Sequence, residues 1–555
     1  MSSIGMTTLV SEIDTNLSIP VNVLKISGRI SLQQLVARLQ TRMAEDPFFT
    51  RFRSIAVDRD HTFVEIPAFD VSCNVFSHVL GEDESALAYV ESLVNRPFDS
   101  AKPLWELHAV LDLSDATQEV THIVWKTHHC IGDGASQSTA LVRLSDNKDT
   151  FDEMIRKMQE TSRAQASSRR SQPKSAMKQL QQLVKHAAML TALCSWSLYV
   201  IVKKSLQLAV RSEPKTLFKK KGGTAKRLSY TNQYSVATTK RVGKKHRATV
   251  NDIMLTCVAG AMRKTMLAAG ETVDPALIVR AAVPVDMRSM NEVIAAAHNK
   301  FSALVLDFPI GVEDPETRLV LIKSGMNEAK LSLEKDFTYG LTHLVAMLPT
   351  ALMKAIVRFS GSRMSVAISN VRGSSVDMDM CGGRVVGFYG FMPPPPTVNL
   401  GIAILSVGDD LGLNVLVDPC VGIDGEQFLK FAEEEYSGDI SVLSIVFTGA
   451  FVGVFAISLG PLIYVVVADL FPDSVRGSAM SVCIFFNFLS NLVFGVSFPY
   501  IADALDNLSF LPFVAMLAIF YVFMRQMLPE TLDKTGDEIQ NEFRELRARK
   551  TAANH

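Results

Sequence analysis

Charged residues are absent from three long stretches near the end of this chain, and that absence limits its possible folds more than any other feature. The stretches are Ile440–Ala468, Gly477–Ala502 and Asn507–Met524, whereas charged residues recur throughout the preceding sequence. Each stretch approaches the roughly 20 apolar residues that a helix needs to cross a bilayer, although Pro512 interrupts the third one. We therefore expect an all-α membrane segment of about three transmembrane helices at residues 440–528.

Composition narrows the class of protein further. The chain has 555 residues, 48% of them hydrophobic, and a formal net charge of -1, which predicts a large core divided among domains and argues against nucleic acid as a partner. Its seven cysteines are scattered without a CxxC pair, which favours a reducing compartment over a zinc or redox site. Residues 1–16 lack the basic and apolar regions of a secretory signal, so membrane targeting is expected from the later stretches.

Before these stretches, apolar residues recur with strand-like and helix-like periods. Residues 1–155 combine short β-branched runs, such as Val21–Ile26, with helical stretches such as Leu32–Glu45. Residues 228–431 show the same mixture, for example in the strand-like run Ala276–Val285. We therefore expect two α/β lobes with these boundaries. Further predicted elements are the strand Thr121–Lys126 and the helix Val250–Leu267.

The first lobe contains a short motif directly behind the apolar run Ile123–Trp125. Residues 128–134 read HHCIGDG, a pattern of the form HHxxxDG. Transfer of an acyl group from a thioester to an alcohol needs a base that takes the hydroxyl proton, and a neutral imidazole titrates near working pH. We predict that His129 is this general base, with a hydrogen-bonded structural histidine as the alternative. Asp133 is predicted to support the loop through a buried hydrogen bond or ion pair.

Neighbouring residues have structural explanations that compete with chemical ones. His128 is expected to point away from His129 if the strand continues, which favours a structural or secondary role. Cys130 lacks the partners of a nucleophilic triad, so a buried small side chain is the simpler interpretation. Asn251 and Asp252 lie where a helix begins, so N-capping competes with a role for Asn251 as polar support in the site.

Five short blocks in the first 431 residues occur together in a recognisable order. In that order and spacing they resemble the wax ester synthase/diacylglycerol acyltransferase family, over roughly Met1 to Phe431. The resemblance implies a two-lobed fold shared with chloramphenicol acetyltransferase and peptide-synthetase condensation domains, with the motif histidine in a tunnel between the lobes. The blocks are Pro103-Leu104-Trp105-Glu106, HHCIGDG, Asn251-Asp252-Ile253-Met254-Leu255, Val283-Pro284-Val285-Asp286-Met287-Arg288 and Ser369-Asn370-Val371.

The resemblance also implies a reaction. Acyl-CoA would enter from one side and a fatty alcohol or diacylglycerol from the other, and His129 would deprotonate the hydroxyl as it attacks the thioester. The product would be triacylglycerol or wax ester, with no acyl-enzyme, no metal and no cofactor beyond acyl-CoA as co-substrate. The chain departs from the family where Arg372-Gly373 replaces the usual Pro-Gly and His298-Asn299 replaces Gly-Asn, which affects the prediction of the substrate more than that of the reaction class.

The last part of the chain resembles a different family. Gly460–Tyr464, Asp469–Pro472, Arg476-Gly477 and Pro529–Thr531 are similar to the closing helices of sugar-porter-type major facilitator transporters. Such transporters use two six-helix halves, so three spans cannot form an alternating-access pathway. We therefore expect a membrane anchor, followed by a charged tail at residues 529–555. The expected origin of the anchor is a gene fusion or a wrongly joined gene model.

Between the two lobes, residues 156–227 are basic and rich in Ser and Gln, which predicts a linker. Its uncharged run His186–Val202 contains two aromatic residues, Trp196 and Tyr199. If this run crossed a membrane, His129 and Asn251 would lie on opposite faces of the bilayer and could not form one site. We therefore expect an interfacial helix that brings the active site near membrane lipid.

The expected topology contains a conflict. Six Lys/Arg residues follow the third apolar stretch, and this positive charge places the C-terminal tail in the cytosol. Three crossings would then place the two N-terminal lobes on the opposite side of the membrane. Acyl-CoA is expected in the cytosol, so we expect a multi-pass protein of the endoplasmic reticulum or plasma membrane with a cytosolic active site. Three alternatives would reconcile these expectations: two segments cross instead of three, the orientation is inverted, or the joined chain is not what the cell makes. The rival functions are a transporter, or the remnant of one, and an inactive lipid-binding scaffold.

Overall fold

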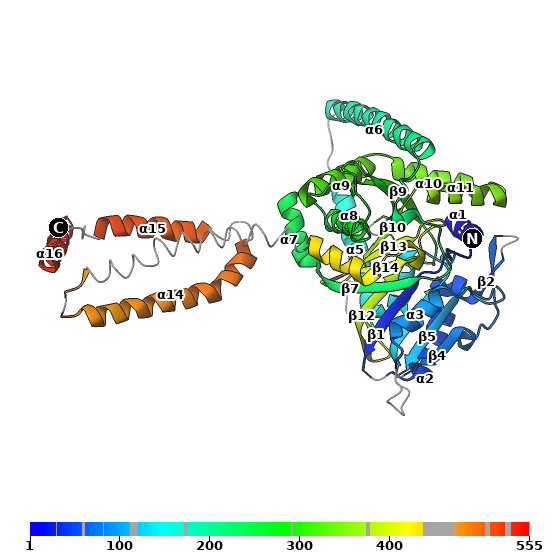
Figure 1. Ribbon diagram of the computed structural model, residues 1–555, viewed down its shortest axis with the longest axis horizontal. Coiled ribbons are helices and arrows are strands. Elements are labelled where there is room, and N and C mark those ends of the chain that lie inside the picture. Colours follow the sequence, from blue (N-terminus) through cyan, green and yellow to red (C-terminus); the bar gives the residue numbers. More distant parts are fainter. Residues whose placement is uncertain are drawn as a thin grey trace. The chain divides into compact units, whose positions relative to one another are not determined.

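The chain forms two compact units in a computed structural model. It describes residues 1–28, 30–57, 61–81, 83–111, 120–170, 176–289, 292, 294–372, 378–436, 470–472, 474–505, 511–527 and 534–553. The first unit is Met1–Asp439 and the second is Ile440–His555. The first unit contains two six-stranded sheets. Helices pack on these sheets (Figure 1).

The first sheet has the strand order β11-β12-β1-β6-β5-β4. The strand that leads into the motif, β6, lies between β1 and β5 and is antiparallel to both, so it occupies an interior position in the sheet. The strands are β1 (Val21–Ser27), β4 (Val75–Val79), β5 (Trp105–Leu111), β6 (Val120–Thr127), β11 (Asp379–Met380) and β12 (Gly383–Phe391). The helices of this part are α2 (Leu32–Glu45), α3 (Ala86–Val94) and α4 (Gly134–Leu144), accompanied by the hairpin β2 (Ser54–Val57) and β3 (Thr62–Glu65).

The second sheet has the order β7-β14-β13-β10-β8-β9, with β10 parallel to both of its neighbours. A large apolar cluster connects this sheet to α8 and α9. The strands are β7 (Arg227–Ser235), β8 (Val279–Asp286), β9 (Phe301–Phe308), β10 (Val366–Arg372), β13 (Leu400–Val407) and β14 (Asp410–Val417). The helices are α7 (Val236–His246), α8 (Val250–Ala268) and α9 (Pro315–Lys330), together with a helix at residues 425–436.

The two-lobed α/β fold agrees with the sequence prediction, but each lobe also includes a segment from the other half of the sequence. Strand β12, from the later part of the sequence, pairs antiparallel with β1 and places Val21 opposite Phe391. It thereby covers an edge of β1 that would otherwise expose unpaired backbone groups. Helix α1 (Ser3–Ser11) in turn packs against α10 (Glu334–Val345) and α11 (Thr350–Ser362). Each lobe therefore contains segments from both halves of the first unit.

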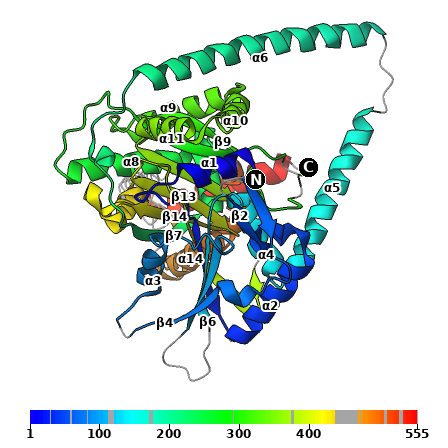
Figure 2. The ribbon, with the colours of Figure 1, turned by 90° about the vertical axis from the view of Figure 1, so that its right-hand side faces the viewer.

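The region predicted as a linker forms two long helices, α5 (Lys148–Arg170) and α6 (Ala176–Val210). The uncharged run at residues 186–202 lies within α6. One face of α6 is anchored on the second lobe, because Val200 is fully buried and Lys204 donates to the Glu334 carboxylate at 2.6 Å. Figure 2 shows α6 on the same side of the first unit as α9, α10 and α11.

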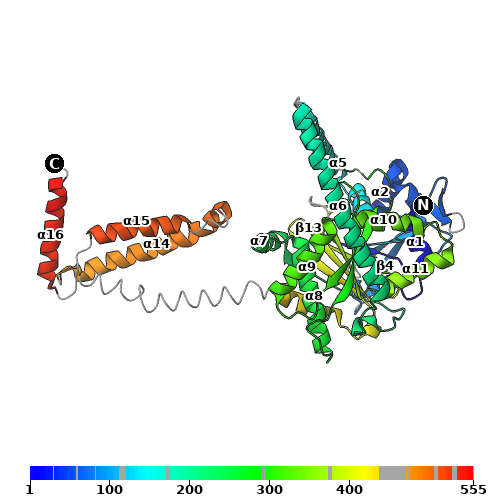
Figure 3. The same cartoon turned by 90° about the horizontal axis from the view of Figure 1, so that it is seen from above.

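The second unit contains α14 (Arg476–Leu505), α15 (Leu511–Met527) and α16 (Gly536–Ala553), drawn in Figure 3. Within the described part of the chain, no helix combines the length and the apolar character needed to cross a membrane, so the prediction of about three transmembrane helices is not supported. The 17 residues of α15 span about 26 Å, less than the ~30 Å hydrocarbon core. Residues 440–469 and 528–533, and with them the first apolar stretch, lie outside the described residues.

Candidate active site

The HHxxxDG motif begins where β6 ends, as the sequence predicts. Two backbone hydrogen bonds hold its first residues: the His128 N–H donates to the Leu104 carbonyl at 2.8 Å, and the His129 N–H donates to the Ser18 carbonyl at 2.8 Å. These acceptors lie in segments that precede β5 and β1, the two neighbours of β6. The backbone of both histidines is therefore fixed by the sheet to which the motif belongs.

The imidazole of His129 faces the second lobe. Its ring centroid lies 5.6 Å from that of Phe301, the first residue of β9. Burial holds the pKa of His129 below its ordinary value, despite the opposing effect of the nearby Asp133 charge. Its Nδ1 atom is buried and has no hydrogen-bond partner among the described residues. At neutral pH the ring is therefore neutral and can accept a proton.

Asn299, from the second lobe, holds the backbone of the motif. It is buried, and its Nδ2 donates to the carbonyls of His129 at 2.9 Å and Cys130 at 3.3 Å. Helix α1 approaches the same place, because a Cβ at Gly5 would lie 2.8 Å from the Cys130 oxygen and 3.1 Å from the Asn299 amide. In the sequence, Asn299 stands out only in the pair His298-Asn299, where the family usually has Gly-Asn, and its contact across 170 positions has no local signal.

Asp133 supports the loop as predicted. It caps the N-terminus of α4, where its Oδ1 accepts from the Ser136 N–H at 3.0 Å. Its Oδ2 accepts from Arg288 Nη1 at 2.9 Å and from the Lys300 N–H at 2.8 Å. A single carboxylate thus orients α4 and connects the motif to the second lobe.

Arg288 is the partner that the sequence did not identify. It follows β8, and its side chain is 4% exposed in its ion pair with Asp133. It also donates to the His298 carbonyl at 2.8 Å and to the Asp286 carboxylate at 3.1 Å. Because a buried charge-assisted hydrogen bond has a defined geometry, this arginine fixes the position of the second lobe relative to the motif.

His128 makes a different set of contacts from His129. The residue is buried, and its Nδ1 accepts a hydrogen bond from the Cys130 N–H at 3.1 Å. Its Nε2 lies 3.6 Å from the Glu12 carboxylate. Because both nitrogens have polar neighbours within the protein, these contacts favour the predicted structural role.

Asn251 lies in the first turn of α8 but does not cap it. The cap is Thr249, which forms a capping box with Asp252, so the capping alternative is confirmed for Asp252 and wrong for Asn251. The Asn251 Oδ1 instead accepts from Asn370 Nδ2 of β10 at 2.9 Å. The next residue, Val371, would lie 3.1 Å from a Cβ at Gly134 in the motif. Polar support of the reaction by Asn251 remains a prediction, whereas its contact with Asn370 joins two of the family blocks.

Behind the motif, β6 carries a buried lysine in an ionic cluster that the sequence did not indicate. Lys126 is fully buried and donates to the Glu106 carboxylate at 3.2 Å and to the Arg96 carbonyl at 2.8 Å. Burial alone would raise the pKa of Glu106, but hydrogen bonding to His108 and the charge of Lys126 lower it to about 2. This cluster fixes the strand that presents the two histidines. Trp105, on the neighbouring strand β5, is fully buried in the core.

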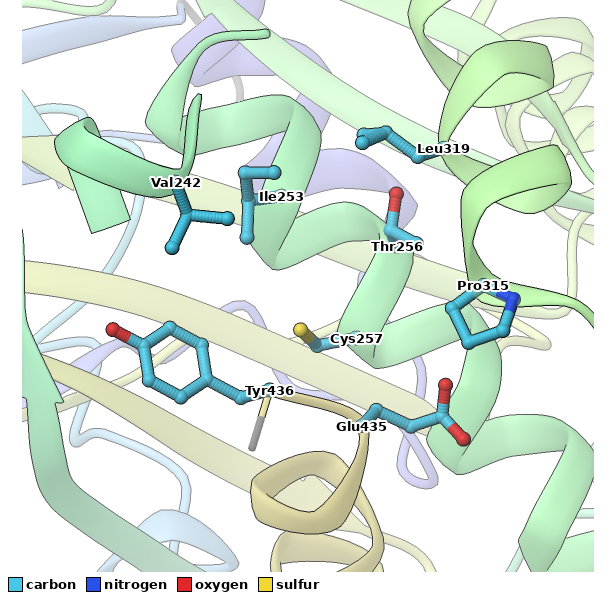
Figure 4. Close-up of a pocket in the computed structure, with 8 residues that line it drawn as sticks. All are labelled: Val242, Ile253, Thr256, Cys257, Pro315, Leu319, Glu435 and Tyr436. Carbon is cyan, nitrogen blue, oxygen red and sulfur yellow. The ribbon is translucent and has the colours of Figure 1, made fainter. Parts of the chain in front are cut away.

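Neither a pocket near α8 nor a metal-binding group of side chains offers a second candidate active site in the described residues. The pocket near α8 has a volume of about 20 Å³. Its lining includes Cys257, Glu435 and Tyr436 (Figure 4) but none of the motif residues. That volume accommodates about one water molecule. In the described ranges of the chain, no three His, Cys, Asp or Glu side chains are grouped so that they could hold a metal ion.

Comparisons with known proteins assign the first unit to a family. Residues 20–254 match the wax ester synthase/diacylglycerol acyltransferase catalytic domain, and residues 297–438 match the WS/DGAT C-terminal domain. A probable diacylglycerol O-acyltransferase of Mycobacterium tuberculosis is 25% identical over 385 residues, which cover 67% of this chain and 80% of that protein. These matches include the HHxxxDG motif and the Asn299 segment.

Two solved structures share the fold. One is the wax ester synthase/diacylglycerol acyltransferase of Marinobacter aquaeolei VT8, with a TM-score of 0.52 and 17% identity, covering 79% of this chain and 98% of that one. The other is the trichothecene 15-O-acetyltransferase TRI3 of Fusarium sporotrichioides, with a TM-score of 0.54 and 13% identity, covering 78% and 93%. These similarities confirm the two-lobed fold.

The end of the chain is similar to another family, as predicted. Residues 421–543 match the sugar (and other) transporter family. The mouse facilitated glucose transporter member 4 is 39% identical over 105 residues, which are 19% of this chain and 21% of the transporter. The similarity therefore covers about a fifth of that transporter. Over residues 20–438, the chain belongs to the wax ester synthase/diacylglycerol acyltransferase family and is an acyltransferase.

Proposed function

We propose that this protein transfers a fatty acyl group from acyl-CoA to diacylglycerol or a long-chain alcohol, with His129 as the general base. The observation that carries this proposal is the neutral imidazole of His129, whose ring lies against Phe301 of the second lobe. The names of the related enzymes supply the two classes of acceptor. The product is triacylglycerol or wax ester.

The reaction is a direct transfer between two substrates. The imidazole accepts the hydroxyl proton of the acceptor while its oxygen attacks the thioester carbonyl carbon. The carbon–sulfur bond then breaks, and the departing thiolate of CoA takes the proton, which leaves an ester and free CoA. The proposed steps use no cofactor other than acyl-CoA as co-substrate, because the thioester already activates the acyl group.

The residues around His129 act by positioning it. A general base contributes roughly 10²- to 10⁴-fold, so the alignment of the reacting groups has to supply much of the remaining acceleration. Asn299 fixes the His129 carbonyl, and the Asp133–Arg288 pair fixes the loop against the second lobe. Both contacts cross between the lobes, so the distance between the lobes determines the geometry of the site.

The decisive experiment compares two neighbouring substitutions in the intact chain. With labelled acyl-CoA and either diacylglycerol or hexadecanol, His129→Ala is expected to lower neutral-lipid formation roughly 10²- to 10⁴-fold. Cys130→Ala is expected to retain activity, because the reaction uses no thiol nucleophile. Equal activity of His129→Ala and the unsubstituted chain would support an inactive, lipid-binding scaffold. Loss of activity only in Cys130→Ala would indicate an acyl-enzyme instead.

We also propose that the protein acts at the cytosolic face of the endoplasmic reticulum or plasma membrane, where acyl-CoA and lipid acceptors meet. The support for this location is the class of substrates. Transport is not proposed, because the similarity covers only 21% of the glucose transporter. Fractionation of cells with the active protein in the soluble fraction and no membrane-bound portion would contradict the proposed location.

A further inference from the structure

The large apolar side chains that the first unit exposes are concentrated on four helices. Isolated exposed apolar residues are normal on protein surfaces, but a contiguous group indicates an interaction site. We call this group the α6 surface. Its members are Met189, Leu190, Trp196, Leu198, Tyr199, Val202, Leu206 and Val210 on α6, Val320 and Leu321 on α9, Phe337, Leu341 and Leu344 on α10, Met347 after it, and Leu352 and Phe359 on α11.

Specific contacts hold these helices together as one surface. Ser197 of α6 accepts a hydrogen bond from the Leu333 N–H at 2.9 Å, and Lys203 pairs with Glu328 of α9 at 3.0 Å. At the other end of α6, Arg363 donates to the Ala209 carbonyl at 3.3 Å. Figures 1 and 2 both show α6, α9, α10 and α11 on the same side of the first unit. The exposed side chains are therefore arranged on a fixed scaffold.

The charged side chains of two of these helices, α6 and α11, are all positive. Helices α6 and α11 contain four and two lysines or arginines, respectively, and neither contains an Asp or a Glu. Lys203 and Lys204 of α6 are ion-paired with Glu328 of α9 and Glu334 of α10, so the charge available to a ligand comes from other residues. Lys185 and Arg358 are exposed, and Lys354 is partly exposed. Trp196 and Tyr199 lie against one another with ring centroids 5.6 Å apart. Amphipathic aromatic residues next to lysines and arginines are typical of helices that lie on an anionic bilayer.

We propose that the α6 surface binds an anionic phospholipid membrane, with α6 lying in the plane of the interface. The apolar side chains enter the boundary between head groups and acyl chains, and Lys185, Lys354 and Arg358 contact the lipid phosphates. A symmetric dimer through the same surface would bring like charges of α6 and α11 together, so a second copy is the less favourable partner. This proposal does not depend on the acyl-transfer reaction.

The α6 surface is also connected to the active site. His343 of α10 contacts Ser3 of α1 at 2.8 Å, and Gly5 of the same helix lies against the Cys130 carbonyl. Helix α1 therefore separates α10 from the HHxxxDG motif. A membrane bound at this surface would hold the active site close to acceptors that are dissolved in the bilayer.

Tryptophan fluorescence provides a local test in the intact chain. The chain has three tryptophans, of which Trp105 and Trp125 are fully buried and Trp196 is 42% exposed. Vesicles of phosphatidylcholine and phosphatidylserine with brominated acyl chains are expected to quench the Trp196 emission and shift it to the blue. The quenching is expected to disappear in Trp196→Phe, which retains an apolar side chain. Because the signal arises at α6, lipid binding by other parts of the chain does not produce it.

The charge contribution has a matched control. Near an anionic surface, each lysine or arginine contributes about 1 kcal/mol, so Lys354→Gln with Arg358→Gln is expected to raise the half-quenching concentration of phosphatidylserine roughly 30-fold. Lys25→Gln with Lys102→Gln, at two exposed positions of the first lobe, is expected to leave it unchanged.

Three results would overturn the proposal. The first is Trp196 emission that does not respond to brominated lipid. The second is Trp196 shielded from water without lipid at every protein concentration, which would mean that the chain's own C-terminal segment covers the surface. The third is shielding that increases with protein concentration in the absence of lipid, which would indicate a second copy. Failure of acyl transfer alone would not affect these readings, because His129→Ala is expected to retain the quenching.

Discussion

Burial of the His129 imidazole determines when this residue is available as a base. The lowered pKa means that the neutral ring persists at a pH where an ordinary histidine, with a pKa near 6.5, is half protonated. We therefore expect log kcat/KM for acyl transfer to stay level as the pH falls through 6.5 and to decline by about one unit per pH unit below the pKa of His129. A pH profile with its acid limb centred at or above 6.5 would contradict this prediction.

The buried ion pair between Asp133 and Arg288 is expected to contribute to the stability of the fold. Asp133→Asn keeps the cap of α4 but removes the buried carboxylate from Arg288, which then pairs only with the half-exposed Asp286, so the free energy of unfolding is expected to fall by about 1–3 kcal/mol. Asp286 pairs with the same arginine at 3.1 Å but is 50% exposed. Asp286→Asn is therefore the control and is expected to cost under ~1 kcal/mol. Denaturant titration of both variants checks the prediction, and equal losses would contradict it.

Two glycines in the middle of helices show how neighbouring side chains limit which residue a helix tolerates at a given position. In α8, a Cβ at Gly260 would lie 2.2 Å from the Glu435 carboxylate and 2.3 Å from the Arg318 guanidinium, whereas a Cβ at Gly325 in α9 would meet nothing within 4 Å. Gly260→Ala is expected to destabilise the fold by about 1–3 kcal/mol, and Gly325→Ala to stabilise it by about 0.5–1 kcal/mol. Thermal melts of the two variants should shift in opposite directions. A shift of the same sign would show that helix propensity dominates at both positions.

Local periodicity predicted most of the elements near the site. The helix predicted at residues 32–45 is α2, and the strand predicted at 121–126 is β6 with one more residue at each end. The helix predicted at 250–267 is α8, which begins at the predicted residue and ends one residue later. The basic region at 156–227 was predicted as a linker because charge and polar composition suggested a solvated segment. Its long helix α6 is stabilised instead by contacts with α9 and α10 that no local pattern encodes.

At the scale of the whole molecule, the acyltransferase unit extends beyond the C-terminal boundary that the sequence predicts. The second lobe was predicted to end at residue 431, but the helix at residues 425–436 continues beyond it. In that extension Glu435 pairs with Arg318, whose side chain is 1% exposed, at 2.5 Å, and Tyr436 contacts Thr239 at 3.0 Å. The unit therefore needs residues that the predicted boundary excludes.

Truncation tests this boundary. A chain stopped after Asp439 is expected to retain the fold of the first unit and acyl transfer to a dispersed acceptor. A chain stopped after Phe431 leaves Arg318 buried without its carboxylate and is expected to be about 3–5 kcal/mol less stable. Denaturant unfolding and activity of the two proteins provide the measurement. Equal stability of both would mean that the extension does not belong to the unit.

The sequence by itself determined the fold class, the motif at the end of β6 and the family, because each depends on residues that are close together in the chain. Only the tertiary structure decided which residues complete the site. Asn299 reaches the His129 carbonyl across 170 positions, and Arg288 reaches Asp133 across 155. Likewise, β12 joins the sheet of the first lobe. Such contacts depend on how the sheets pack and on which buried charges find partners, and these are properties of the assembled fold that no short stretch of sequence contains.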